Sequence, residues 1–348
     1  ESMGFWLMAW EKLGTASVTS TAVNTSWKEL GRTTLGSAGD AINVTGLTAK
    51  DNMMVLTHII HSGQIQNNMR FNNDSGNNYG NKYSNDGGSD SNFTSQANIV
   101  NSDTYTSDVF QLDNVINNNS SQEKLVIGGL VAENTSGAGN APRRTEYAGK
   151  WANTSDSITQ VNLINTGSGD FDTGSEVVVL GYDNDEADSG TNFWQELARV
   201  ESSATDDTIT TGTISAKKYL MVNFYASYTG DTNSVMVFNS DTGSNYSQRN
   251  SFSGGSDGTN TSQANFTFSD SSVKNWIKGR VFIVNKSDKE KLYIVEQMNG
   301  NDGAGNAPAR AEFVGKWANT SDSITNITMN QSGSGSFTYK HLQVFGAD

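Results

Sequence analysis

Acidic residues that could perform acid–base chemistry recur at two matching places in this sequence. Glu146 lies two residues after Arg144, and Glu312 lies two residues after Arg310. Paired carboxyl groups are what a glycosidase uses, but each Glu here has a basic neighbour instead of a second acid. Residues two apart on a strand share one face, so the spacing predicts a structural ion pair at each place. We expect substitution of Glu146 or Glu312 to disturb folding and not to remove an activity.

Other catalytic chemistry has little support. The chain has no cysteine, which excludes disulfides, cysteine-based zinc sites and a thiol nucleophile. The three histidines are His58, His61 and His341. The first two lie three apart in a strand-like run, which predicts that they face opposite ways and share no metal. We find neither a His-Glu-x-x-His motif nor a phosphate-binding loop, and the sequence predicts a protein that is not an enzyme.

Two loops gather Asp and Asn residues around a glycine. They span residues 72–78 and 239–245, and their candidate calcium ligands are Asp74, Asn78, Asp241 and Asn245. Hard cations prefer such oxygen ligands, so calcium is the one cofactor that the sequence suggests. Asn, Asp and Gly also form tight turns, and neither loop has the full spacing of a known calcium loop, so a plain turn is the alternative.

A Lys-Trp pair also recurs, at Trp151 and at Trp317. An exposed tryptophan could form a platform on which a sugar stacks. A tryptophan at a strand end more often fills the core of a sandwich, because it buries a large apolar area. Both interpretations stay open, and the core is favoured.

These residues recur because the chain contains two copies of one unit. Residues 137–142 and 303–308 are both Gly-Ala-Gly-Asn-Ala-Pro, and residues 149–159 and 315–325 are identical over eleven positions. Matches continue upstream at nearly the same offset. The sequence therefore predicts an N-terminal arm at residues 1–25, repeat 1 at 26–183, a linker at 184–193 and repeat 2 at 194–348. We expect the arm, with Phe5, Trp6 and Trp10, to anchor the protein in an assembly; a disordered leader is the alternative.

Apolar runs of four to eight residues, rich in β-branched and aromatic side chains, are bounded by Gly, Asn, Asp or Ser throughout both repeats. This pattern is typical of strands, and no convincing amphipathic helix is found. About eight strands fit in each repeat, with long loops at residues 72–95 and 101–123. We predict an all-β protein of two tandem β-sandwiches, jelly-roll-like, that arose by internal duplication.

Composition excludes several classes of partner. The 348 residues carry a net charge of −14, with 34% hydrophobic and 9% aromatic residues. Lys and Arg are sparse, so a nucleic acid or an anionic membrane surface is a poor partner. No apolar run approaches the roughly 18 residues of a membrane span. The aromatic content argues against disorder.

The repeated segments resemble predicted structural proteins of environmental, mainly marine, viruses. The resemblance lies in residues 137–142 and 149–159 with their second copies, in residues 71–79 and 167–171, and in the Met8-Ala9-Trp10 start. It covers both repeats. Repeat 2 departs from the pattern at residues 336–340, which replace residues 170–174 of repeat 1. The resemblance implies a virion-associated protein without indicating which part of the virion.

We therefore expect a non-enzymatic structural protein of the virion surface, which is extracellular, such as a capsid shell, decoration or turret subunit. Its partners would be other copies of itself and virion shell proteins. The alternative is an adhesin, either a receptor-binding tail fibre or a cell-surface protein, whose polar loops recognise a host surface glycan or a protein.

Overall fold

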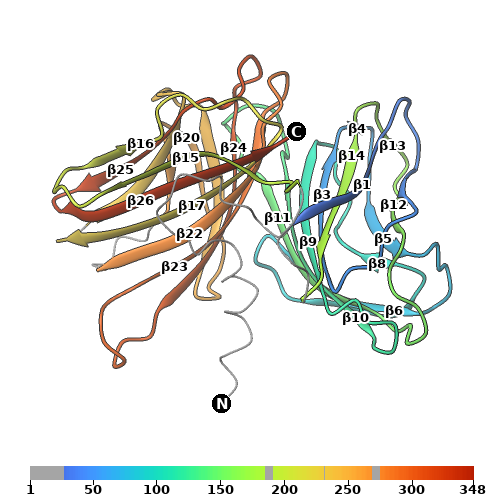
Figure 1. The fold of residues 1–348 in the computed structure, drawn as a ribbon. Helices are drawn as coiled ribbons and strands as arrows, with labels where there is room; N and C mark the ends of the chain where they lie inside the picture. Colours follow the sequence, from blue (N-terminus) through green and yellow to red (C-terminus); the bar gives the residue numbers. More distant parts are fainter. Residues whose placement is uncertain (1–26, 185–190, 231, 269–274) are drawn as a thin grey trace.

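The predicted all-β fold is confirmed. The computed structural model describes residues 27–184, 191–230, 232–268 and 275–348, and these ranges contain strands and no helix (Figure 1). None of the described segments is therefore a helix that could cross a membrane. The expected anchoring arm, with Phe5, Trp6 and Trp10, lies outside the described residues. Each repeat forms a β-sandwich of a large eight-stranded sheet and a small four-stranded sheet, and the paired strands run antiparallel.

In repeat 1 the large sheet has the order β1-β14-β3-β9-β10-β11-β6-β7, and the small sheet has the order β2-β12-β5-β8. Neighbours that are far apart in sequence, such as β14 beside β3, require long crossovers between the sheets, as in a jelly roll. The strands are β1 Lys28–Thr34, β2 Ala41–Val44, β3 Asn52–Ile59, β4 His61–Ser62, β5 Asn67–Phe71, β6 Tyr79–Asn85, β7 Ser91–Gln96, β8 Ile99–Val100, β9 Val109–Ile116, β10 Lys124–Ala132, β11 Arg143–Trp151, β12 Val161–Asn165, β13 Asp170–Phe171 and β14 Glu176–Tyr182.

Repeat 2 has the same plan, with the large sheet β15-β26-β17-β22-β23-β24-β19-β20 and the small sheet β16-β25-β18-β21. Its strands are β15 Gln195–Ser202, β16 Thr208–Thr210, β17 Tyr219–Thr229, β18 Thr232–Phe238, β19 Tyr246–Phe252, β20 Gly258–Gln263, β21 Phe266–Thr267, β22 Trp276–Val284, β23 Lys291–Gly300, β24 Ala309–Trp317, β25 Ile327–Gly333 and β26 Ser336–Ala347.

The prediction of about eight strands in each repeat was too low. The supposed loops at 72–95 and 101–123 contain β6, β7 and β9. In β6 only every second side chain, at Tyr79, Asn81 and Tyr83, is buried. Such a strand is polar on its solvent face, so its sequence looks like a loop unless alternation is followed residue by residue.

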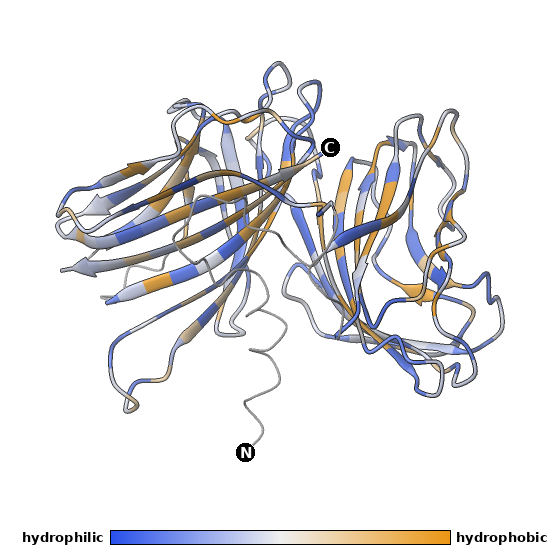
Figure 2. Cartoon of the chain, in the orientation of Figure 1, coloured by the Kyte–Doolittle hydropathy of each residue, from blue (hydrophilic) through white to orange (hydrophobic). Residues whose placement is uncertain are grey.

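Each sandwich has its own apolar core between its two sheets. Leu130, Tyr147 and Met69 belong to the core of repeat 1, and Val295, Phe313 and Met329 belong to that of repeat 2. Hydropathy alternates along the strands accordingly, with apolar segments inside both sandwiches and hydrophilic loops (Figure 2).

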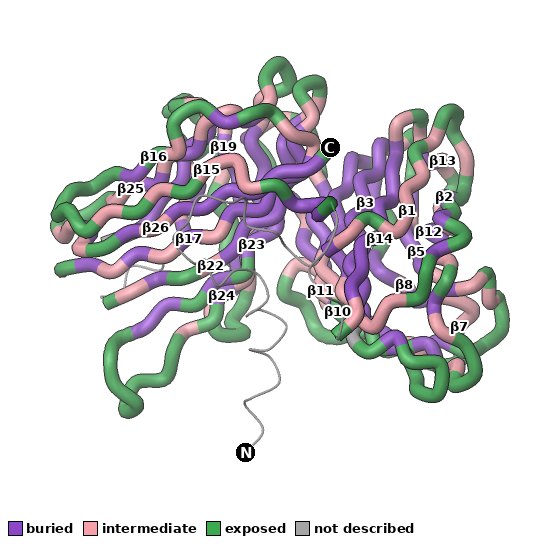
Figure 3. Tube along the Cα trace, in the orientation of Figure 1, coloured by how far each residue is buried: buried purple, intermediate pink, exposed green. Residues whose placement is uncertain are grey.

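A third apolar core joins the two repeats. The outer faces of the two large sheets pack against each other, so their central strands are buried on both sides (Figure 3). Ring contacts cross this boundary, as between Phe110 and Tyr219, whose centroids are 6.5 Å apart. Parts of the predicted linker also belong to this core, since Phe193 is buried and its backbone N–H donates to the Trp27 carbonyl at 2.9 Å. The core comprises Trp27, Met54, Leu56, Phe110, Leu112, Val131, Val178, Leu180, Tyr182, Phe193, Trp194, Tyr219, Met221, Phe282, Val284, Leu292, Ile294, Val314, Phe345 and Ala347.

Candidate functional site

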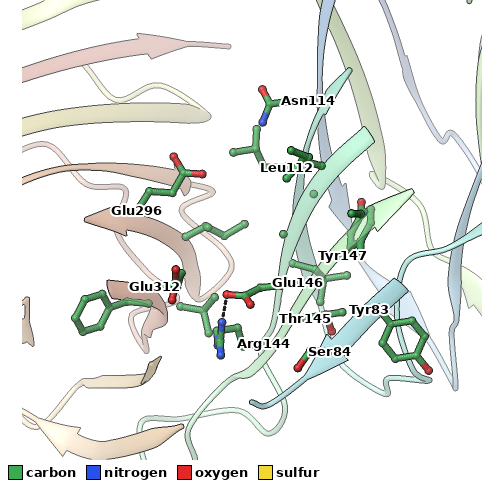
Figure 4. Close-up of a pocket in the computed structure, with 18 of the residues that line it drawn as sticks. Tyr83, Ser84, Leu112, Asn114, Arg144, Thr145, Glu146, Tyr147, Glu296 and Glu312 are labelled. Carbon is green, nitrogen blue, oxygen red and sulfur yellow. Dashed lines mark hydrogen bonds and ion pairs between the residues drawn. The ribbon is translucent and has the colours of Figure 1, made fainter. Parts of the chain in front are cut away.

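A cleft of about 430 Å³ lies where the two large sheets diverge beside the third core. Strands β6, β9, β10 and β11 of repeat 1 form one wall, and β23 and β24 of repeat 2 form the other. Apolar residues such as Leu112, Ile127, Ile294 and Val314 contribute to its lining. Figure 4 shows acidic side chains from both repeats in this cleft.

The two glutamates singled out in the sequence, Glu146 and Glu312, both line this cleft. A third glutamate, Glu296, also lines the cleft, because it lies on β23 directly opposite Glu312 on β24. Partial burial, and next the charge of Glu146, raise the pKa of Glu312 above its ordinary value. Repeat 1 holds Gly129 at the position that matches Glu296, so the acidic group is asymmetric.

Each glutamate forms the predicted ion pair with the arginine two residues before it. Arg310 Nε lies 2.5 Å from Glu312 Oε1, and Arg144 pairs with Glu146 (Figure 4). Their strands place both members of each pair on the outer face of a large sheet, as the period-two argument required.

Arg144 also has a partner that the sequence did not reveal. Its Nη2 lies 2.6 Å from Asp257 Oδ1 and its Nε lies 3.2 Å from Asp257 Oδ2, which makes a two-pronged pair between the repeats. The side chains are only 5% and 2% exposed. The two residues are 113 positions apart and come from different repeats, so no local pattern could connect them.

The cleft contains carboxyl groups that could take part in acid–base chemistry, but these groups form ion pairs that stabilise the fold. A carboxyl group of raised pKa beside a second carboxylate is a pattern that hydrolases use. Here both Glu146 and Glu312 are held by arginines of their own strands, and Arg144 also closes the joint between the repeats. The arrangement therefore acts first as an electrostatic fastening.

Residues 254–258 read Gly-Gly-Ser-Asp-Gly, which fits the spacing of a nucleophile elbow. Such an elbow presents its serine on a turn from a strand to a helix. Ser256 instead lies in the exposed turn of the β19–β20 hairpin. The Asp of this segment is Asp257, the partner of Arg144, so the segment serves the joint between the repeats.

The two predicted calcium loops are built as identical hydrogen-bonded clamps. Asp74 Oδ1 accepts a bond from the Gly76 backbone N–H at 2.8 Å, and Oδ2 accepts bonds from Asn78 Nδ2 at 2.9 Å and Trp151 Nε1 at 2.7 Å. Burial alone would raise the pKa of Asp74, but these donors outweigh it and hold the pKa below its ordinary value.

Repeat 2 reproduces the clamp bond for bond. Asp241 accepts from Gly243 at 2.8 Å, Asn245 at 2.9 Å and Trp317 at 2.7 Å. Within the ranges that the structure describes, no three His, Asp or Glu side chains converge as metal ligands. Asn78 and Asn245 present their amide N–H groups to the carboxylates, so a calcium ion would have to displace these donors. Calcium binding stays a prediction that these contacts do not favour.

The two tryptophans are core residues. Trp151 is 1% exposed and Trp317 is 0% exposed. Each stacks on a tyrosine, with 6.3 Å between centroids for Tyr79–Trp151 and also for Tyr246–Trp317. The core interpretation therefore holds, and the sugar-stacking alternative is wrong, because no face of either ring reaches the surface.

The histidines do not lie as the strand pattern predicted. Strand β3 ends at Ile59 and β4 begins at His61, so alternation is broken between His58 and His61. His61 Nδ1 lies 3.2 Å from Asp108 Oδ1, and the same carboxylate influences His58. Burial lowers the pKa of His58 to about 3 in spite of Asp108, so His58 stays neutral.

Sequence reasoning missed a polar cluster inside the core of repeat 1. Asp113 is fully buried, Gln111 Nε2 donates to its Oδ2 at 2.8 Å, and the Tyr147 hydroxyl contacts its Oδ1. Burial raises the pKa of Asp113 to about 8. By strand register, repeat 2 has Val281 at the position of Asp113, Gly279 at that of Gln111 and Phe313 at that of Tyr147. This difference between the repeats depends on which residues face each other across the strands, so it can be recognised only in the structure.

Comparison with known proteins adds little. No protein-family model matches the sequence, and no curated protein matches it either. Among solved structures, the LG1-3 region of the laminin α2 chain aligns with 88% of this chain and 64% of its own, at 8% identity and a TM-score of 0.19. Mouse laminin α1 domains LG4-5 align with 91% of this chain and 93% of their own, at 12% identity and a TM-score of 0.17. These scores are too low to carry an argument, and the fold class rests on the sheets themselves.

Proposed function

We propose that this protein is a non-enzymatic structural subunit of a virion surface, in the shell, a decoration layer or a turret. The observation that carries the proposal is the third apolar core, which joins two sandwiches into one block. A subunit of a particle surface has to keep a fixed shape between neighbours, and a doubled block with polar loops meets that need.

The use of the repeated motifs supports the same proposal. The Asp–Trp clamps and the Arg–Glu pairs occur in both repeats, and each stabilises a loop or a sheet. A duplicated structural device suits a protein selected for shape, because each copy stabilises its own sandwich. The viral part of the proposal comes from the sequence resemblance.

The test is the copy number of the chain in purified virions, measured by quantitative mass spectrometry against the major shell protein. A copy number comparable to that of the shell protein is the expected result. A few to a few dozen copies per particle would replace the proposal with the adhesin on a fibre or vertex. Absence from particles would overturn it.

A further inference from the structure

We propose that repeat 1 carries a docking site for residues 303–308 of a second molecule of this protein. The site is a duplicate of one that the chain already uses internally. The inference goes beyond the proposed function, because it names the self-association surface and does not depend on a virion.

The internal contact is made by the loop between β10 and β11, which contains residues 137–142. This loop reaches over to strands β19, β20 and β24 of repeat 2 and bonds to them mainly through its backbone. The contacts are Gly137 N–H to Glu290 Oε1, Ser262 N–H to Ala138 O at 2.8 Å, Ser247 Oγ to Asn140 O at 3.0 Å and Arg249 Nε to Pro142 O at 2.9 Å.

Lys316 completes the internal contact. Its Nζ donates to the Glu133 carbonyl at 3.1 Å and to the Thr135 carbonyl, and it lies 3.3 Å from Glu290 Oε2. The side chains of Lys316 and Glu290 are 0% and 6% exposed. The loop therefore buries this ion pair almost completely.

Repeat 1 has the same receiving surface, and it is uncovered. Lys150 and Glu123 occupy the positions of Lys316 and Glu290 and pair at 2.9 Å, but their side chains are 50% and 43% exposed. Ser95 matches Ser262 in its unusual backbone, with φ of 53° against 52°, which aims the N–H in the same local way.

Two further positions of the surface have changed. Lys82 occupies the position of Arg249, so the positive charge is kept. Gly80 occupies the position of Ser247, so one hydroxyl donor is missing. We therefore expect the external contact to keep most of the internal hydrogen bonds and to be weaker than the internal one.

The matching loop of repeat 2 is also unused. Residues 303–308 repeat the sequence of residues 137–142, and all six are exposed. Both halves of a second contact are thus present in every molecule, and neither is occupied within the described residues.

The exposed apolar side chains support this pairing. Leu125 and Ile127, beside the receiving surface, are 57% and 47% exposed, and Met298, beside the loop, is 45% exposed. By strand register they match Leu292, Ile294 and Val131, which are all buried in the third core. Three of the four large exposed hydrophobic residues of the described chain are therefore copies of residues that the internal contact buries.

The loop that binds the receiving surface of repeat 1 comes from a second molecule, because residues 303–308 of the same molecule are held away from that surface. Repeat 2 is fixed against repeat 1 by the third core and by the buried Arg144–Asp257 pair. Rotation of repeat 2 far enough to seat its own loop on Lys150 would break those contacts. A contact between the loop of one molecule and the receiving surface of the next is heterologous, so it joins molecules head to tail.

Single cysteines test the contact directly, since the chain has none of its own. Ala304→Cys and Ser95→Cys are placed in separate full-length chains, because the internal bond joins the matching residues, Ala138 and Ser262. The two proteins are mixed and treated with a short bis-maleimide. We expect a cross-linked heterodimer that forms faster than either homodimer. A chain with Ser203→Cys, an exposed position that follows β15, is the control partner.

A second measurement uses sedimentation of the cysteine-free protein over a concentration series. Lys150→Glu should weaken self-association at least tenfold, whereas Arg199→Glu, which makes the same charge change at an exposed site on β15, should leave it unchanged. Thermal melts check that both variants are folded. The proposal is overturned if the protein stays monomeric up to millimolar concentration, or if a chain carrying both cysteines cross-links only within itself.

Discussion

Asp74 shows how much of this fold depends on single carboxylates. It closes its loop, orients Asn78 and holds the indole of a buried tryptophan, and Asp241 does the same in repeat 2. The adjoining turn explains the residue types of the loop. Asn72 and Asn73 both have positive φ, 51° and 57°, a conformation that Asn tolerates better than most residues. The turn that the sequence offered as the alternative to calcium is therefore present.

We expect Asp74→Ala to lower the free energy of unfolding by about 1.5–3 kcal/mol, the usual contribution of hydrogen bonds to a charged group. Asp241→Ala should cost a similar amount, and the two losses should add because the sites are far apart. Urea unfolding with calcium and with a chelator measures this. A loss that appears only when calcium is present would instead support a bound ion.

Asp113 should give the protein a pH-dependent stability. Its folded pKa, about 8, is higher than the value near 4 of an unfolded Asp, so the folded state keeps a proton that the unfolded state releases. Stability should therefore fall as pH rises from about 4 to about 8 and then level off. Between pH 5 and pH 8 this residue's share is on the order of 3–4 kcal/mol.

The neutral variant Asp113→Asn should lose that share of the pH dependence and be more stable than the wild type at pH 8. Urea unfolding at pH 5, 6.5 and 8 provides the measurement. Asp207→Asn, at an exposed position, is the control and should follow the wild type. A wild-type curve that shows no decline across this range would mean that Asp113 is ionised in the core.

At the level of elements, the loop between β10 and β11 fastens repeat 1 to repeat 2 and buries Lys316 of β24, whereas the matching Lys150 of repeat 1 stays exposed. Lys316→Met should cost about 3–5 kcal/mol, because it leaves Glu290 buried without its cation. The matched change in repeat 1, Lys150→Met, removes an exposed pair and should cost less than about 1 kcal/mol. Thermal and urea unfolding of the two variants checks the contrast. Equal losses would contradict the burial difference on which the docking site depends.

Strands could be predicted from the sequence where both faces are apolar, and not where one face is polar. Residues 53–60 are apolar enough to be recognised, and the structure has β3 there. Strand β7, Ser91–Gln96, has no buried residue, so nothing in its composition distinguishes it from a loop. It is a strand because β6 offers it an edge to pair with, which is information that lies elsewhere in the chain.

The candidate site shows the same limit. The Arg–Glu pairs could be predicted because both partners lie two residues apart on one strand. The meeting of Glu146 with Glu312 and of Arg144 with Asp257 could not, because each depends on how one sandwich packs on the other. The duplication revealed two similar units, but two similar units can pack in many ways.

For the whole molecule, the third core should make the two sandwiches unfold together. Phe282 is 1% exposed and lies in that core. Phe282→Ala should cost about 3–5 kcal/mol and should split a single calorimetric transition into two. Phe266→Ala, in the inner core of repeat 2, is the matched control, and we expect it to destabilise the protein without removing the link between the repeats. Two transitions in the wild type would contradict the coupling.

The polar cluster around Asp113 has a consequence for how the chain finds its fold. Neighbouring units of similar sequence can exchange strands while they fold, and such misassembly is a known failure of tandem repeats. If β9 entered the sheet of repeat 2, Asp113 would meet Phe313 where it now meets the Tyr147 hydroxyl, and a buried carboxyl group would lose a partner. If β22 entered repeat 1, Tyr147 would face Val281. Asp113 thus disfavours the exchange of β9 and β22 between the repeats, and it guides each of these two strands to its own sandwich as the chain folds.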